Sequence, residues 1–157
     1  MRRLTVYFIF VLSLFSFKFS FAQSETSMQD IVENVSGRIK ELEKDNDIEI
    51  VNVTIDLLVK DSRKSFIRYL DPDFEYTAIA IGDRRIDSLT LSVYRPGISD
   101  VEYVSESKGK FPLVHFSIIE PELFEFMVNV NKYSESNMTG HFAVIIYHKI
   151  SPNLKSE

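Results

Sequence analysis

The pattern of hydrophobic positions divides the chain into one helix followed by a series of strands. Between residues 27 and 44, apolar side chains recur every three or four positions, which is typical of one face of an α-helix. An isolated helix of this length is marginal in water, so we expect its apolar stripe to be buried, against the same domain or against a partner. The stripe consists of Met28, Ile31, Val32, Val35, Ile39 and Leu42.

From residue 48 onward the hydrophobic period changes to two, which predicts strands. The first of them, over 48–59, carries Val51, Val53, Ile55, Leu57 and Val59 on one side. Further strands are predicted over 65–70, 74–81, 88–94, 101–105, 113–119, 123–130 and 141–150. Residues 74–81 are apolar on both faces and predict a central strand, whereas 101–105 predict an edge. Short strands separated by turns favour a mostly β fold, an antiparallel jelly-roll-like sandwich of about seven to eight strands, or a barrel, with one N-terminal helix.

The first 22 residues have the layout of a secretory signal peptide. Arg2 and Arg3 precede an apolar run over 4–17, and small residues occupy positions 20 and 22, which predicts cleavage before Gln23. The apolar run is too short to favour a stable membrane span. We therefore expect a periplasmic or secreted domain, divided into a signal peptide (1–22), a leader and helix (23–47), a β-sandwich (48–150) and a polar tail (151–157).

Composition excludes several classes of function. The chain contains no cysteine, so disulfides, thiolate metal sites and lipid attachment through cysteine are excluded. Removal of the signal, which is basic and carries no acid, would lower the net charge from −5 to −8. Such an acidic domain is a poor candidate for nucleic acid, whose phosphates require clustered Lys and Arg. Three Asn-x-Ser/Thr sequons begin at Asn34, Asn52 and Asn137, and their use as glycan acceptors is left open because most bacteria do not read the motif.

Residues 74–149 resemble the bacterial pre-peptidase C-terminal domain, a secreted jelly-roll-like β-sandwich. The resemblance rests on an apolar strand that ends in Gly82-Asp83 and on an alternating strand led by Asp87 that ends near Tyr94. It continues through residues 112–116, 124–130 and 140–147. Members of this family usually accompany an exported enzyme or adhesin, and the loop after Gly-Asp often carries aspartates that can hold calcium. This chain has Arg84 and Arg85 in that loop, so we expect neither a metal nor a cofactor.

The residues that could carry catalysis do not form a recognisable motif. The three histidines are interpreted as structural, and His115 is expected to face away from the side on which Val114 and Phe116 lie. The densest group of acids consists of Asp71, Asp73, Glu75, Asp83 and Asp87, which solvated turns explain more simply than an acid–base pair does. No nucleophile, base and orienting group can be assigned together, so no enzymatic activity is expected.

The candidate binding residues are Asp83, Arg84, Arg85 and Asp87, with Tyr94 nearby in sequence. Two arginines between two acids could grip a carboxylate or sulfate, or could pair with the adjacent acids. The hypothesis is an exported, non-catalytic β-sandwich that binds a protein or glycan partner in the cell envelope. The alternatives are a small exported hydrolase that uses the turn carboxylates and a structural subunit of an envelope complex.

Overall fold

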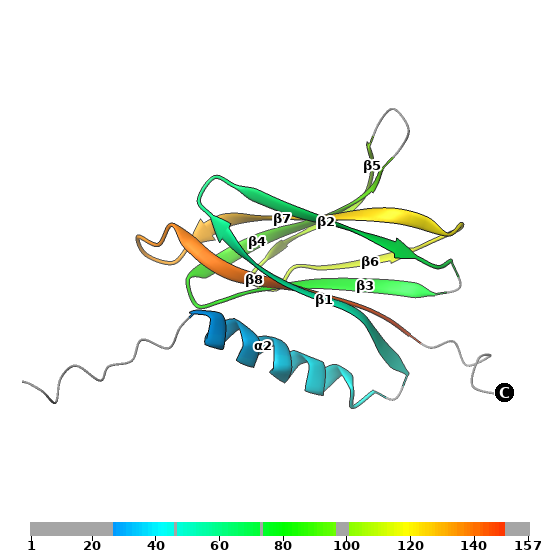
Figure 1. Cartoon of the computed structure of the whole chain (residues 1–157), viewed down its shortest axis with the longest axis horizontal. Helices are drawn as coiled ribbons and strands as arrows, with labels where there is room; N and C mark the ends of the chain where they lie inside the picture. Colours follow the sequence, from blue (N-terminus) through cyan, green and yellow to red (C-terminus); the bar gives the residue numbers. More distant parts are fainter. Residues whose placement is uncertain (1–26, 46, 73, 97–100, 150–157) are drawn as a thin grey trace, which may run out of the picture.

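The computed structural model describes residues 27–45, 47–72, 74–96 and 101–149. They form a helix and eight strands, in which two sheets lie one above the other and the helix covers the outer face of the lower sheet (Figure 1). The elements are α2 (Ser27–Leu42), β1 (Ile48–Val59), β2 (Arg63–Leu70), β3 (Glu75–Gly82), β4 (Ile86–Pro96), β5 (Val101–Gly109), β6 (Leu113–Ser117), β7 (Glu122–Tyr133) and β8 (Thr139–Lys149). The predicted signal peptide, its cleavage before Gln23 and the polar tail over 151–157 lie outside the described residues.

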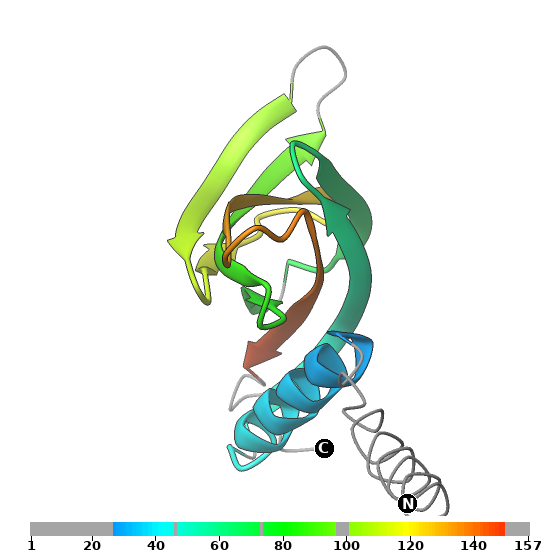
Figure 2. The ribbon, with the colours of Figure 1, turned by 90° about the vertical axis from the view of Figure 1, so that its left-hand side faces the viewer.

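The strand order confirms the predicted jelly-roll sandwich. Sheet A has the order β1-β8-β3-β6 and sheet B the order β2-β7-β4-β5, and the strand pairs of the described residues are antiparallel. Consecutive strands lie in different sheets everywhere except at β4 and β5, so the chain crosses the sandwich six times. Figure 2 looks along the stacked sheets and shows the strands wrapping around a common interior.

The interior between the sheets is filled by alternate side chains of both. Three phenylalanines, Phe124, Phe126 and Phe142, are fully buried there, and Phe66 stacks on Phe126 with ring centroids 5.3 Å apart. A chain without disulfides must be held by its core, and aromatic rings bury the most apolar area per residue. The predicted central strand is confirmed, because β3 pairs with β6 and β8 and is buried along almost its whole length.

The helix packs on its own domain. Ile31, Val35 and Leu42 are buried against the outer face of sheet A, where Ile145 and other side chains of β3 and β8 form a second apolar cluster. Ile39 is partly buried against the same cluster. The expected burial is therefore confirmed for Ile31, Val35, Ile39 and Leu42, which pack against the same domain, whereas Met28 and Val32 are exposed. No helix among the described residues is long and apolar enough to cross a membrane.

Strand β1 departs from a regular sandwich strand. From Val53 to Val59 its alternating apolar residues share one side, but that side is the outer face of sheet A, where the helix cluster partly buries Ile55 alone among them. Val51, Val53, Leu57 and Val59 are all exposed, while the inner side carries Asn52, Thr54 and Asp56 before the buried Leu58. A register shift between Ile50 and Asn52 marks a bulge. The sandwich is thus open along the edge between β1 and β2.

Candidate functional site

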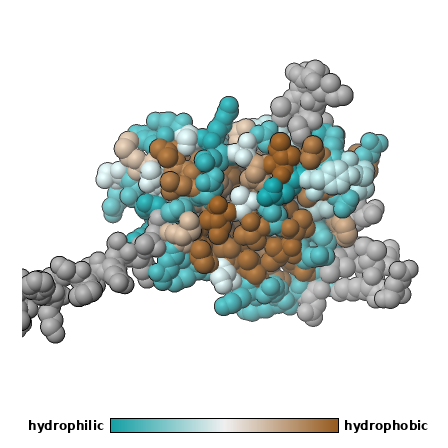
Figure 3. Space-filling view, viewed as in Figure 1, coloured by the Kyte–Doolittle hydropathy of each residue, from teal (hydrophilic) through white to brown (hydrophobic). Residues whose placement is uncertain are grey.

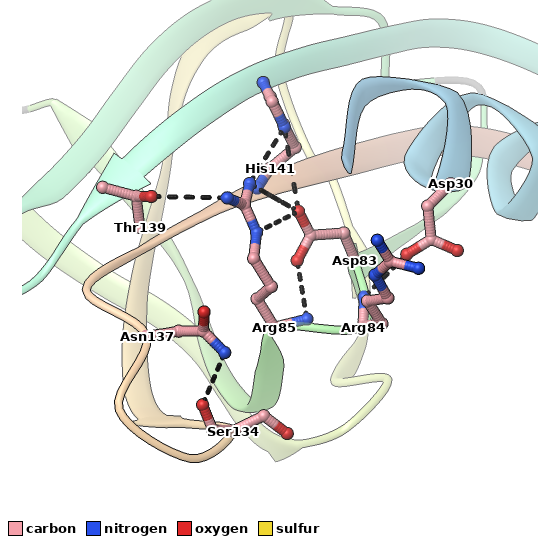
Figure 4. A network of polar contacts seen from close by, with 8 residues as sticks. All are labelled: Asp30, Asp83, Arg84, Arg85, Ser134, Asn137, Thr139 and His141. Atoms are coloured by element: carbon pink, nitrogen blue, oxygen red, sulfur yellow. Dashed lines mark hydrogen bonds and ion pairs between the residues drawn. The ribbon is translucent and has the colours of Figure 1, made fainter. Parts of the chain in front are cut away.

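The turn after β3, where the sequence predicts a binding loop, is organised around the buried carboxylate of Asp83. Its Oδ2 accepts a hydrogen bond from the backbone N–H of His141 at 2.8 Å, and its Oδ1 accepts one from the N–H of Arg85 at 2.9 Å. The N–H of Asp83 in turn donates to the carbonyl of His141 at 2.9 Å. Asp83 therefore ties the β3–β4 turn to the first residues of β8 (Figure 4).

Arg85 pairs with Asp83, which is one of the two alternatives that the sequence left open. Its Nε and Nη2 donate to Oδ2 of Asp83 at 3.2 and 3.0 Å. The guanidinium also lies 3.5 Å from Oγ1 of Thr139 and 3.4 Å from Nδ1 of His141. A buried carboxylate is stable when it is paired and hydrogen-bonded, and Arg85 supplies both. Asp83 and Arg85 thus hold the turn together, and neither presents a fully exposed charge.

Arg84 and Asp87 lie on the outside of the same turn. The side chain of Arg84 is exposed, and its backbone N–H donates to Oδ2 of Asp30 in the first turn of α2 at 2.7 Å. Asp87 accepts a hydrogen bond from the hydroxyl of Ser134 at 2.7 Å and lies 3.3 Å from Nζ of Lys132. The Ser134 hydroxyl and then Lys132 hold the pKa of Asp87 below its usual value. These two residues form the part of the predicted loop that a partner could contact.

Tyr94 does not lie beside this turn. It follows Ile86 by eight residues on β4, and a strand advances about 3.3 Å per residue, so the two ends are roughly 26 Å apart. Tyr94 instead lines a groove over the outer face of sheet B, the face that no helix covers. The structure therefore brings Asp83, Arg84, Arg85 and Asp87 together and places Tyr94 in a separate site.

The groove on sheet B has a volume of about 590 Å³ and is built from rows of side chains that cross the sheet. The register places Arg63, Asn129, Thr90 and Lys108 in one row from β2 to β5, and Met127 leads into the next row. Side chains at paired positions point to the same face, so each row forms one rung of the groove. The lining residues are Asp61, Ser62, Arg63, Thr90, Ser92, Tyr94, Glu106, Lys108, Met127, Asn129, Val130 and Asn131.

Hydroxyls and amides dominate this lining, and its charges balance. Glu106 accepts a hydrogen bond from the hydroxyl of Ser92 at 3.0 Å and forms an ion pair with Lys108 at 3.1 Å. The contact with Lys108, and next the one with Ser92, lower the pKa of Glu106. Asp61 and Arg63 place one further charge of each sign at the other end of the groove. The lining therefore favours a polar, uncharged ligand over a strongly acidic or basic one.

Asn129 has the best position to bind a ligand. Its side chain is partly exposed in the middle of the groove, and no hydrogen bond within the described chain involves its amide. Neighbouring Asn131 is engaged, because it accepts from Thr90 at 2.9 Å and donates to Ser88 at 3.4 Å. Sequence reasoning missed Asn129. The signal that could have found it is the polar alternation of Asn129 and Asn131 on an otherwise apolar strand.

The remaining polar candidates are dispersed. As predicted, His115 is exposed while Val114 and Phe116 are buried, and His148 stacks on Phe74 with ring centroids 3.9 Å apart. Among the acids, Asp71 follows β2 and Asp83 follows β3, at opposite ends of β3, while Asp73 lies outside the described residues. In the part of the chain that the structure describes, no three His, Cys, Asp or Glu residues are grouped to hold a metal ion. Of this acid group, Asp71 and Asp83 are therefore held apart, whereas Asp83 and Asp87 belong to the same turn.

No family model and no curated protein matches the sequence. Among solved structures, the Yersinia pseudotuberculosis-derived mitogen is similar at 10% identity and a TM-score of 0.47, over 66% of this chain and 87% of that one. The pre-peptidase C-terminal domain of Bacillus anthracis collagenase, whose family the sequence resembles, is similar at 12% identity and a TM-score of 0.45, over 60% and 87%. A family 11 carbohydrate-binding module from Clostridium thermocellum, in complex with a β-1,3-1,4-mixed-linked tetrasaccharide, is similar at 10% identity and a TM-score of 0.34, over 66% and 89%.

Proposed function

We propose that this protein is an exported, non-catalytic module that binds a neutral glycan chain in the groove on sheet B. The observation that carries the proposal is the amide of Asn129, which has no hydrogen-bond partner among the described residues and is centred in a groove of about 590 Å³. That volume lies within the range of about 300–1,000 Å³ for small-molecule sites. Sugar hydroxyls are donors and acceptors at once, and they suit a lining of amides and hydroxyls whose charges cancel.

Aromatic side chains at one end of the groove support a sugar ligand. Tyr94 lines the groove and is paired with Glu125. The next row of the sheet pairs Tyr69 with Leu123, and both of these side chains are exposed. A tyrosine ring presents an apolar face and a polar hydroxyl, so it can stack on a sugar while it donates a hydrogen bond. A chain of sugars would then extend from these rings toward Asn129.

The test is affinity electrophoresis in gels that contain one neutral polysaccharide each, followed by calorimetry on any that retards the protein. We expect Asn129→Ala and Tyr94→Ala each to weaken binding at least tenfold without a change in melting temperature. Asn34→Ala, on the exposed side of α2, is the matched control and should bind as the wild type does. Absence of retardation by every neutral polysaccharide, together with binding of a peptide that Asn129→Ala abolishes, would replace the glycan with a protein ligand.

The loop predicted from the sequence is the second candidate surface, and exposed Arg84 is the residue that favours it. Asp83 and Arg85 are engaged in holding the turn, so a partner there would contact Arg84 and Asp87. Arg84→Ala should leave folding unchanged, since exposed loop substitutions usually stay within about 0.5 kcal/mol. Loss of partner binding in Arg84→Ala but not in Asn129→Ala would move the binding site from the groove to this loop.

A further inference from the structure

The open edge of sheet A forms a second surface, distinct from both candidate binding sites. Among the described residues, β1 pairs on one side with β8, and no strand pairs with its other side. The N–H of Lys60 points toward β8, because it donates to the carbonyl of Met138. The N–H groups of Leu57 and Val59 instead donate to the side chains of Asp56 and Ser62. Backbone groups alternate in direction along a strand, so those of the odd-numbered residues point to the open side. The backbones of Val53 and Ile55 therefore face outward with no strand beside them.

The side chains of the same alternate residues form an apolar patch. Val53 and Ile55 are paired with Ile145 and Ala143, which lie on the helix side of sheet A. Helix α2 packs mainly over β8 and β3, so Ile55 is only partly buried and Val53 is exposed. Val53, Leu57 and Val59 expose 37–48% of their surface. Figure 3 shows hydrophobic side chains gathered over β1 on this face of the molecule. A long apolar edge strand is a ready template for pairing with another strand.

We propose that β1 pairs in an antiparallel manner with β1 of a second copy of this chain, around a two-fold axis at Ile55. The apolar row is self-complementary about this residue: Ile55 meets Ile55, and Val53 meets Leu57 on each side of the axis, up to the bulge at Val51. Because the outward-facing residues are the ones in these pairs, their N–H and C=O groups can bond across the axis. The two four-stranded sheets become one continuous sheet, and the symmetry closes the assembly at a dimer.

The charges along the edge are complementary in the same register. Thr54 would lie opposite Asp56 of the second copy, and Nη2 of Arg68 lies 3.4 Å from Oγ1 of Thr54. Each Arg68 would thus approach a carboxylate of the other chain, twice in the dimer. In the monomer, Asp56 instead accepts from the N–H of Leu57 at 2.7 Å and pairs with Lys64 at 3.0 Å. These contacts shield an unpaired edge. In the dimer, the N–H of Leu57 would donate to the carbonyl of Val53 of the second copy in place of the Asp56 carboxylate.

The dimer leaves the uncovered faces of both B sheets accessible, since only the edge of sheet A takes part. One dimer would carry two grooves, and two linked sites can bind a polymer much more tightly than one. This consequence rests on the proposed function, but the dimer itself does not, because its residues and contacts lie on the other sheet.

The absence of cysteine from the chain allows a direct test of the register. Paired residues of this kind have Cα atoms about 5.5 Å apart, within the range of about 4.4–6.8 Å that a disulfide spans. Ile55→Cys should therefore form a covalent dimer on mild oxidation. Val53→Cys and Leu57→Cys should cross-link when mixed, and each alone should remain largely uncross-linked. Ile67→Cys, at a position on β2 that is more exposed than Ile55, is the control and should stay monomeric.

Analytical ultracentrifugation of the cysteine-free protein completes the test. We expect a dimer for the wild type, and a monomer with an unchanged circular dichroism spectrum for Val53→Lys. A wild type that remains monomeric up to several hundred micromolar overturns the proposal. Cross-linking of Ile67→Cys at the same rate as Ile55→Cys, or of Val53→Cys alone at the rate of the mixture, overturns it as well.

Discussion

The carboxylate of Asp83 and the backbone N–H of His141, 58 positions apart in the sequence, are joined by a hydrogen bond of 2.8 Å. Because Arg85 pairs with the same buried oxygen and its N–H donates to the other one, removal of Asp83 takes an acceptor from two backbone N–H groups and from the guanidinium. We expect Asp83→Ala to lower the free energy of unfolding by about 2–4 kcal/mol, measured by urea denaturation; the range lies below that of a fully buried pair because Arg85 is partly exposed. Asp87→Ala is the control, and an equal loss in both variants would contradict a special role for Asp83.

The helix provides a second test. Ile31 is fully buried against sheet A, so Ile31→Ala should lower the free energy of unfolding by about 2–5 kcal/mol. Met28, one turn earlier and exposed, is the matched control, and Met28→Ala should change the stability by less than about 0.5 kcal/mol. Equal urea midpoints for Ile31→Ala and the wild type would mean that the helix is not part of the cooperative unit.

Local periodicity predicted the elements of this fold, because side-chain spacing is dictated by each element's own geometry. It thus identified the helix stripe through Ile31 and the central position of β3. It also grouped Val53 with Leu57, but it could not show that the helix leaves them exposed, since coverage depends on where α2 docks. The groove could not be predicted for the same reason: Asn129 and Tyr94 come to line one groove only through the pairing of β4 with β7.

Tyr133 gives a prediction that runs against the usual effect of truncation. Its hydroxyl is buried and, within the described part of the chain, has no hydrogen-bond partner. A buried unsatisfied polar group costs roughly 1–3 kcal/mol, so Tyr133→Phe should be neutral or more stable than the wild type at pH 7, by up to about 2 kcal/mol. A clear loss of stability in urea denaturation would show that the hydroxyl has a favourable interaction.

The same residue should also influence stability at high pH. Burial, and next the carboxylate of Asp83, raise the pKa of Tyr133 above its usual value of 10.0. Above the pKa of the unfolded state, the unfolded chain loses this proton before the folded chain does, so stability falls as the pH rises through the folded-state pKa. The advantage of Tyr133→Phe over the wild type should therefore grow above about pH 10. Urea midpoints at pH 7 and pH 10.5 measure it, and a constant difference would contradict the shift.

Gly82 and Gly140 both lie against the side chain of Ile86 but close to different atoms of it, so substitutions can distinguish the two contacts. A Cβ at Gly140 would lie 2.6 and 2.7 Å from Cγ1 and Cδ1 of Ile86, whereas one at Gly82 would lie 2.8 Å from its Cβ. Since Ile86 is buried and cannot move freely, each Gly→Ala variant should lower the free energy of unfolding by about 1–3 kcal/mol.

Ile86→Ala distinguishes the two positions. It removes Cγ1 and Cδ1, both short contacts of the Gly140 position, whereas at the Gly82 position it removes the 2.9 Å contact with Cγ2 but keeps the shortest one, 2.8 Å to Cβ. In that background Gly140→Ala should lose most of its effect, whereas Gly82→Ala should keep most of its own. The measurement is a pair of double-mutant cycles from urea denaturation, in which residues in contact usually show coupling of about 0.5–3 kcal/mol. The remaining contact of the Gly140 position, 3.1 Å to Oδ1 of Asp83, should keep a small residual penalty in the Ile86→Ala background. Equal coupling in both cycles would mean that the whole side chain of Ile86 shifts. The penalty of Gly140→Ala would then not come from the γ and δ carbons of Ile86 alone.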